Sequence, residues 1–276
     1  TMHARVLILH IPVIHKGYLD FFERNKKKIA SIYLIPDALV EQLSSIKPDI
    51  ASIPAEKIQD LCRTLGYPQT SVFAEDMVRE LSGKPLLLIN DRISRALQKR
   101  YFPKSDVEWD SVFLRWDIDS IHAEEPASFR ESRDSSDQEM MRQAYREAEK
   151  SSDWWRRVGA VAVRRGKVIN VAHNEGMPSD YTQYQRGAVR DFLAPGVQPE
   201  LVDTLHAEQK LIAQAARQGM SLDDASLYVT HFPCPVCAKL MIGSGISRCF
   251  FTEGWSTLAS ASLLKAAGIG ITKVIL

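Results

Sequence analysis

Hydrophobic and polar positions follow a repeating strand–helix rhythm over the first 120 residues. Continuous apolar runs within residues 4–10 and 84–90 are typical of strands buried on both faces. Further strands are predicted at 29–35, 70–73 and 107–116, and helices at 17–24, 38–46, 55–65, 75–82 and 92–101. Asp91 is the expected N-cap of the last helix. Strands that alternate with helices predict a parallel sheet covered on both faces, so residues 1–120 are expected to form an α/β domain.

The rhythm stops between residues 121 and 137. The stretch from His122 to Asp137 is polar, charged and rich in serine, with one proline and no periodic apolar positions. Such a composition predicts a linker between two domains.

A second series of elements follows over residues 138–276. A helix is predicted at 138–150, and strands at 158–164 and 168–172 flank a turn at Arg165-Gly166 that suits a hairpin. A helix capped by Asp203 and ended by Gly219 comes next. Strands at 226–230, 248–252 and 271–275, with helices at 235–242 and 259–267, complete the series. The order predicts a second α/β domain.

Two short motifs at consecutive helix starts carry the candidate chemistry of this second domain. His206-Ala207-Glu208 is an H-x-E sequence, and residues 233–237 read P-C-x-x-C. One imidazole and two thiolates bind zinc and leave one tetrahedral position open for water. The ligands expected are His206, Cys234 and Cys237, and a helix N-terminus favours the thiolate form of the cysteines.

Glu208 is the expected proton carrier of this site. A carboxylate beside the metal, but not bound to it, can move protons between water and a leaving group. Either motif alone is weak: His122-Ala123-Glu124 repeats H-x-E in the linker, and C-x-x-C also occurs as a redox pair. The two in order are the pattern of zinc-dependent nucleobase deaminases, which are hydrolases of cyclic amidines.

Three further stretches resemble the cytidine and deoxycytidylate deaminases. They are Arg157-Val158-Gly159-Ala160-Val161, residues 171–178 around Asn174, and residues 227–234 leading into the cysteines. The resemblance implies a three-layer α/β/α domain with a mixed five-stranded sheet. It also implies that Asn174 binds the sugar and that the backbone N–H of Ala207 holds the base carbonyl. Glu175 interrupts the asparagine–glycine pair of the family, and Trp154-Trp155 is unusual ahead of the first strand. Deamination of dCMP to dUMP is the activity expected.

A nucleotide substrate requires cations for its phosphate and surfaces for its base. Arg186 and Arg190, together with Arg156 or Arg157, are the candidates for the phosphate. Tyr181 and Tyr184 are candidates for stacking on the base. A solvated arginine and an insert-packing tyrosine are the competing interpretations of these residues. His231 is interpreted as a pocket wall, because a fourth protein ligand would close the metal site.

The first domain carries one weaker motif. It has no G-x-G-x-x-G sequence and no P-loop. Residues 13–19 resemble the H-x-G-H segment of cytidylyltransferase-like nucleotidyltransferases, with Tyr18 in place of the second histidine. Ile93-Ser94, with Lys99 or Arg100, resembles their basic motif. The expectation is a Rossmann-like, non-catalytic relative, and a chance match in an ordinary α/β domain is the alternative.

Composition narrows the partners of the chain. Its 276 residues carry a formal net charge of +1, so nucleic-acid binding is not favoured, although a local basic patch near Trp154 and Trp155 would allow a polynucleotide substrate. The four cysteines are too few for a disulfide scaffold, and neither a membrane-spanning run nor a secretory signal is seen. A cytoplasmic protein is expected, and self-association is implied by the family resemblance. A zinc-stabilised regulatory protein that binds nucleotides without turnover is the alternative of another class.

Overall fold

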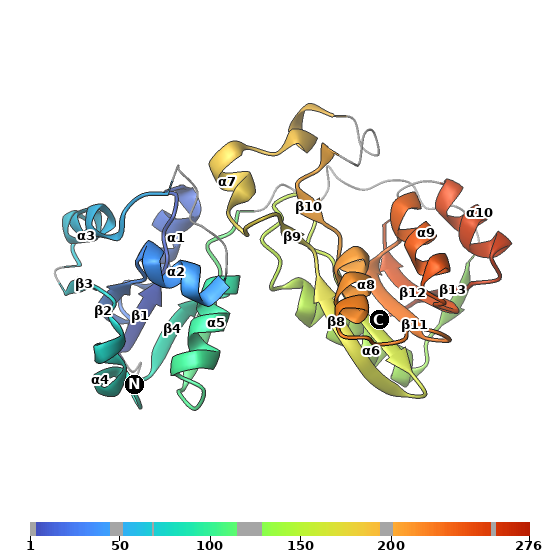
Figure 1. The fold of residues 1–276 in the computed structure, drawn as a ribbon, viewed down its shortest axis with the longest axis horizontal. Coiled ribbons are helices and arrows are strands. Elements are labelled where there is room, and N and C mark those ends of the chain that lie inside the picture. Colours follow the sequence, from blue (N-terminus) through green and yellow to red (C-terminus); the bar gives the residue numbers. More distant parts are fainter. Residues whose placement is uncertain (1–3, 45–51, 68, 115–128, 194–200, 255–257) are drawn as a thin grey trace. The chain divides into compact units, whose positions relative to one another are not determined.

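The computed structural model of the chain describes residues 4–44, 52–67, 69–114, 129–193, 201–254 and 258–276. The chain divides into two compact units (Figure 1). Unit 1 comprises Thr1–Leu114 with Tyr184–Arg186, and unit 2 comprises Arg115–Gln183 with Gly187–Leu276. Among the described residues, none of the helices combines the length and the apolar character needed to cross a bilayer.

Unit 1 is built on a five-stranded parallel sheet, as predicted. The strands are β1 (Arg5–Leu9), β2 (Ile29–Leu34), β3 (Thr70–Val72), β4 (Leu86–Ile89) and β5 (Val107–Asp110), in the order β3-β2-β1-β4-β5. The two central strands β1 and β4 carry the apolar runs that identify them in the sequence. Their side chains are almost all fully buried because helices cover both faces.

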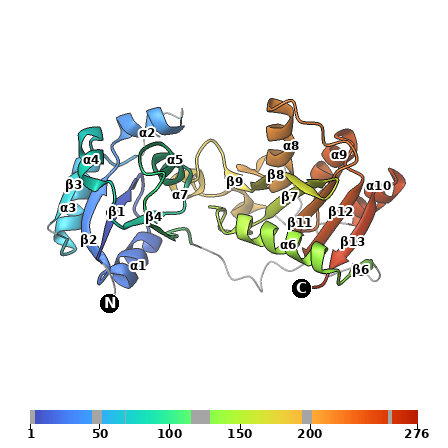
Figure 2. The ribbon, with the colours of Figure 1, turned by 90° about the horizontal axis from the view of Figure 1, so that it is seen from below.

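The helices of unit 1 occupy both sides of this sheet. They are α1 (Lys16–Asn25), α2 (Asp37–Ser44), α3 (Ala55–Thr64), α4 (Val78–Leu81) and α5 (Arg92–Tyr101), with a 3₁₀ turn η1 (Glu75–Met77) ahead of α4. Leu39 of α2 and Leu97 of α5 pack on Ile8 and Leu88. Figure 2 shows α2 and α5 on one side of the strands and α1 on the other.

Unit 2 contains a mixed sheet of six strands, not five. Its order is β6 (Arg130–Ser132), β13 (Gly270–Val274), β12 (Arg248–Glu253), β11 (Ser226–His231), β7 (Gly159–Arg164), β8 (Lys167–His173). Strand β7 alone runs in the direction opposite to the other five strands of this sheet. The extra strand, β6, comes from the segment interpreted as linker. It is three residues long, polar and largely exposed, so no apolar alternation marks it in the sequence.

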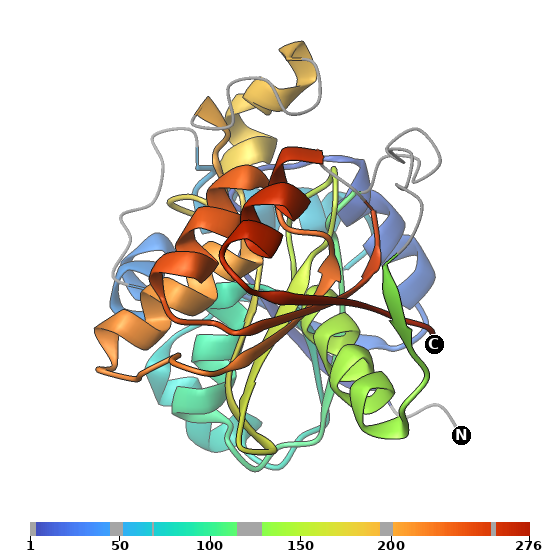
Figure 3. The same cartoon turned by 90° about the vertical axis from the view of Figure 1, so that its right-hand side faces the viewer.

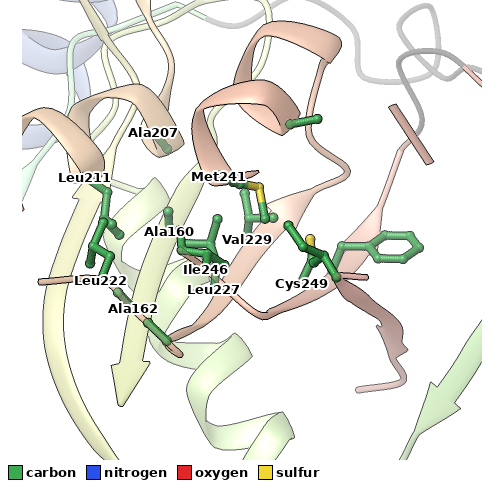
Figure 4. Close-up of a cluster of buried hydrophobic side chains, with 14 of the residues drawn as sticks. Ala160, Ala162, Ala207, Leu211, Leu222, Leu227, Val229, Met241, Ile246 and Cys249 are labelled. Atoms are coloured by element: carbon green, nitrogen blue, oxygen red, sulfur yellow. The ribbon is translucent and has the colours of Figure 1, made fainter. Parts of the chain in front are cut away.

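Three layers make up unit 2 (Figures 2 and 3). Helix α6 (Ser135–Ala148) covers one face, where Met141 and Ala144 pack on Val161 and Tyr228. Helices α8 (Ala207–Arg217), α9 (Pro235–Gly243) and α10 (Leu258–Ala266) cover the other face. Figure 4 shows this second core, in which Leu211 and Met241 lie over the alternate side chains of the strands. The layers agree with the three-layer arrangement that the resemblance implies.

Two helix starts differ from the predictions. Helix α6 begins at Ser135 with Asp134 as its N-cap, inside the predicted linker. Helix α8 is capped by His206 and not by Asp203, because Thr204–Leu205 forms a short strand, β10, that pairs with β9 (Glu175–Gly176). The repeated H-x-E at His122 lies outside the described residues.

Candidate active site

The two motifs lie at the starts of α8 and α9. His206 is the N-cap of α8, and its backbone N–H donates to Oε1 of Gln209 at 2.9 Å. Cys234 is the N-cap of α9, and Pro235 occupies the first helical position, where a missing N–H costs no hydrogen bond. Each ligand-bearing residue is therefore fixed by a helix start rather than by a free loop.

The three predicted ligands come together in space. Nδ1 of His206 lies 3.5 Å from Sγ of Cys234 and 3.4 Å from Sγ of Cys237. Tetrahedral zinc with its usual bond lengths to sulfur and nitrogen would set an N–S separation of about 3.6 Å. The donor set and its spacing therefore fit zinc. Among the described residues, these three form the only such group, which leaves a fourth position without a protein ligand.

Electrostatics favour the charged forms of His206 and Cys234 and the neutral form of Cys237. Burial alone would lower the pKa of His206, but the neighbouring Cys234 and Glu208 outweigh burial and raise it. The Cys237 thiol donates to the sulfur of Cys234, which, with the His206 contact, lowers the pKa of Cys234 to about 4. The same bond, together with burial, raises the pKa of Cys237.

Glu208 stands beside these ligands as the second residue of α8. It is 4% exposed, and burial raises the pKa of its carboxyl to about 7. A carboxyl group whose pKa lies near neutral pH in a covered site is suited to accept and release protons. Ala207, the first residue of α8, is fully buried next to it.

Asn174 lies where β8 ends, and its side chain holds the neighbouring backbone. Its Oδ1 accepts from the N–H of Val158 at 2.7 Å, and its Nδ2 donates to the carbonyl of Arg156 at 2.7 Å. One N–H and one lone pair of the amide are left over by these two bonds. The structure thus gives Asn174 a role in shaping the segment before β7, which the sequence did not suggest.

A cationic group adjoins the ligands. Nη1 of Arg190 lies 4.0 Å from Oδ2 of Asp153, and the charge of Arg190 acts on His206. Burial lowers the pKa of Arg156, and the Arg190 charge lowers it further. The two guanidinium groups therefore influence each other, and the charge of Arg190 also acts on His206.

Comparison with known proteins defines the family. The family model of the cytidine and deoxycytidylate deaminase zinc-binding region matches residues 134–253. Deoxycytidylate deaminase of Mus musculus is 31% identical over 142 residues, which are 47% of this chain and 74% of that protein. The chain belongs to this family. The matched residues are the zinc-binding region of the family, and both motifs lie inside them.

Two other known proteins are also similar to about half of this chain. ComE operon protein 2 of Bacillus subtilis (strain 168) is 30% identical over 118 residues, covering 42% of this chain and 59% of that protein. The chain therefore spans little more than half of that relative. The crystal structure of dCMP deaminase from the cyanophage S-TIM5 in apo form gives a TM-score of 0.40 at 22% identity, over 51% of this chain and 99% of that one.

Four other residues that were predicted to bind the substrate lie in different surroundings. Tyr181 is 2% exposed and packs within unit 2. Tyr184 belongs to unit 1 by its contacts: its ring stacks on His15 at 4.5 Å between centroids. Arg186 is also part of unit 1 and is exposed. Arg157 is partly buried just before β7.

Asp153 is a residue that the sequence interpretation missed. It is fully buried, accepts from the backbone N–H groups of Trp155 and Arg156, and accepts from the Thr204 hydroxyl at 2.6 Å. It thereby ties the segment before β7 to the strand that leads into His206. A single aspartate in a polar stretch carries no periodic signal, so only the fold reveals it.

Proposed function

We propose that the chain hydrolyses the amino group of a cytosine nucleotide, most simply converting dCMP and water to dUMP and ammonia. The proposal depends most on one observation: the three expected ligands lie together, and the buried Glu208 lies beside them. Proteins named deoxycytidylate deaminase from mouse and from Enterobacteria phage T4 are about 30% identical to unit 2, which supports cytosine as the base.

Each proposed step is assigned to a group of this chain. Zinc held by the three ligands would supply water acidified for attack at C4 of the base. Glu208 takes a proton from that water, delivers it to N3, and then carries a proton to the amino group, which leaves as ammonia. The N–H of Ala207 donates to the base carbonyl, and the remaining N–H of Asn174 donates to the sugar.

Arg190 and Arg156 are proposed to bind the phosphate. The charge of Arg190 acts on His206 and on Arg156, and the Arg190 side chain is 24% exposed, so it reaches solvent. Guanidinium groups bind phosphate oxygens in pairs of hydrogen bonds. Arg190→Leu should raise KM for dCMP by about tenfold, the usual size of one lost charge-assisted bond, and should leave KM for deoxycytidine unchanged.

The test of the proposed function is an ammonia-release screen. Cytosine, adenine and guanine nucleosides, their monophosphates and short oligonucleotides are compared with the full chain loaded with zinc. We expect dCMP to be the best substrate and deoxycytidine to be much poorer. Preferred turnover of an adenosine-containing oligonucleotide would overturn the proposal in favour of a polynucleotide deaminase. Ammonia release from none of them would favour the regulatory alternative.

Unit 1 is proposed to be a non-catalytic, Rossmann-like unit. Its strand order is that of doubly wound sheets. Nδ1 of His15 accepts from the backbone N–H of Gly17, and the hydroxyl of Tyr18, which replaces the expected second histidine, donates to the carbonyl of His10. These groups are engaged in holding the start of α1, so nucleotidyl transfer from CTP is not expected.

A further inference from the structure

A cluster of charged side chains lies buried in unit 2, and the proposed reaction uses none of it. The side chains of Glu175, His173, Lys210 and Glu147 are between 4% and 12% exposed. They come from α6, the consecutive strands β8 and β9, and α8. Buried charges are costly unless they are paired and hydrogen-bonded, so such a cluster needs a physical account.

The hydrogen bonds of the cluster form one chain. Nζ of Lys210 donates to Oε2 of Glu175 at 2.8 Å and lies 3.2 Å from Nε2 of His173. An ammonium group only donates, so Nε2 accepts and the proton of the neutral ring is on Nδ1. From there it is donated to Oε1 of Glu147 at 2.9 Å, and Lys150 contacts the other oxygen of Glu147 at 2.6 Å.

The charges within the chain of hydrogen bonds balance. Two ammonium groups face two carboxylates, with a neutral imidazole between them. Burial would raise the pKa of Glu147, but its bonds with His173 and Lys150 outweigh burial and lower it to about 2. Removal of Lys210 would take away the ammonium group that contacts the buried Glu175 carboxylate at 2.8 Å, which is costly for a buried charge.

The two ends of the Glu175–Lys210 bridge attach to the active site. Glu175 follows Asn174 directly and pairs in register with Leu205, the residue before His206. Lys210 lies one turn into α8, where its backbone N–H donates to the carbonyl of His206 at 2.9 Å. The bridge thus links the turn that carries Asn174 to the first turn of the helix that carries the ligand.

Backbone bonds hold this turn, and the Asn174 side chain adds two bonds to the segment before β7. The ladder between β9 and β10 is two residues long on each strand, and so short a ladder is weak on its own. The flanking backbone bonds are Asn174 N–H to Val158 O at 3.0 Å and Met177 N–H to Asp203 O at 2.8 Å. The Glu175–Lys210 bridge adds a directional restraint between this turn and α8, whereas the bonds of the Asn174 side chain go to the segment before β7.

We propose that Lys210 and Glu175 are positioning residues that hold the Asn174 turn in register with the start of α8, and so set the geometry in which the nucleotide is bound. The effect on the substrate rests on the proposed function. The restraint on the turn is independent of the proposed function.

The test compares Lys210→Met, Glu175→Leu, the double variant, and Lys150→Met as a control that removes the same charge from the far end of the cluster. For the nucleotide that the wild type deaminates, Lys210→Met should raise KM about tenfold or more, with kcat changed less than about threefold and zinc content unchanged. The double variant leaves no unpaired carboxylate, so its Tm should recover, but its KM should stay raised. Lys150→Met should keep the KM of the wild type.

A second readout does not depend on turnover. Hydrogen exchange at the amides of Asn174 and Met177 should be faster in Lys210→Met and in the double variant, and unchanged in Lys150→Met. Equal exchange in all variants, or a KM that recovers together with Tm in the double variant, would overturn the positioning role. If the wild type deaminates no nucleotide, the proposed function fails, and the exchange comparison still decides the role of the bridge.

Discussion

Glu208 is the residue on which turnover depends most directly. We predict that Glu208→Gln binds zinc as the wild type does, because the amide has nearly the same shape and the carboxylate is not a ligand. Turnover should fall by about 10²–10⁴-fold, the usual contribution of a positioned proton carrier. Metal content and ammonia release measured on the same preparation check this.

The matched control for Glu208 is Glu139→Gln, the same substitution at a half-exposed position of α6. Its turnover should equal that of the wild type. Turnover of Glu208→Gln within a factor of about three of the wild type would show that another group carries the proton.

Whether a residue of the site could be predicted from the sequence depended on whether it belongs to a motif. His206, Glu208, Cys234 and Cys237 could be assigned because metal chemistry demands those residue types at that spacing. In the structure the side chains of His206, Cys234 and Cys237 lie close enough together to hold one metal ion. Asp153 and Lys210 could not be found, since their partners lie on other elements and a buried charge has no pattern of its own in a sequence.

Gly159 sets how closely α6 approaches β7. A Cβ atom at this position would lie 1.9 Å from the carbonyl oxygen of Ala144 and 2.7 Å from the backbone nitrogen of Ala148. Both contacts are with helix backbone, which cannot rotate away. We predict that Gly159→Ala destabilises the protein by about 1–3 kcal/mol, as overpacking does, with urea unfolding as the measurement.

Gly243 provides the comparison within the same unit. It ends α9, has no atom within 4 Å of the added methyl group, and needs no left-handed backbone. Gly243→Ala should be neutral or stabilising by up to about 1 kcal/mol, because alanine loses less backbone freedom on folding. Equal destabilisation by both substitutions would rule out the packing explanation.

Elements with strong apolar periodicity were predictable, and short polar ones were not. The apolar runs locate β1 and β4 in the sequence, because a strand that is buried on both faces consists almost entirely of apolar residues. Strands β6 and β10 have three and two residues, and their pairing depends on partners distant in the sequence. The missed β10 also explains why the start of α8 was placed at Asp203.

At the scale of the whole chain, the division into units depends on contacts that no local pattern records. Tyr184–Arg186 lies in the middle of the second half of the sequence but belongs to unit 1 through contacts such as the stacking of Tyr184 on His15. An insert with few apolar residues gives no sign of which core it joins. Tyr184 was for this reason predicted as a base-stacking residue of the deaminase site.

Metal removal should affect the two units unequally. All three ligands belong to unit 2, on α8 and at the start of α9, so bound zinc stabilises the folded form of that unit by mass action. We predict that a chelator abolishes turnover and speeds hydrogen exchange in α8, α9 and β11, while exchange in β1 and β4 of unit 1 is unchanged. Added Zn²⁺ should restore both properties, whereas Mg²⁺, which prefers oxygen ligands, should restore neither. Turnover by protein shown to be free of metal would contradict the assignment of the site, and faster exchange in β1 would show that the metal also stabilises unit 1.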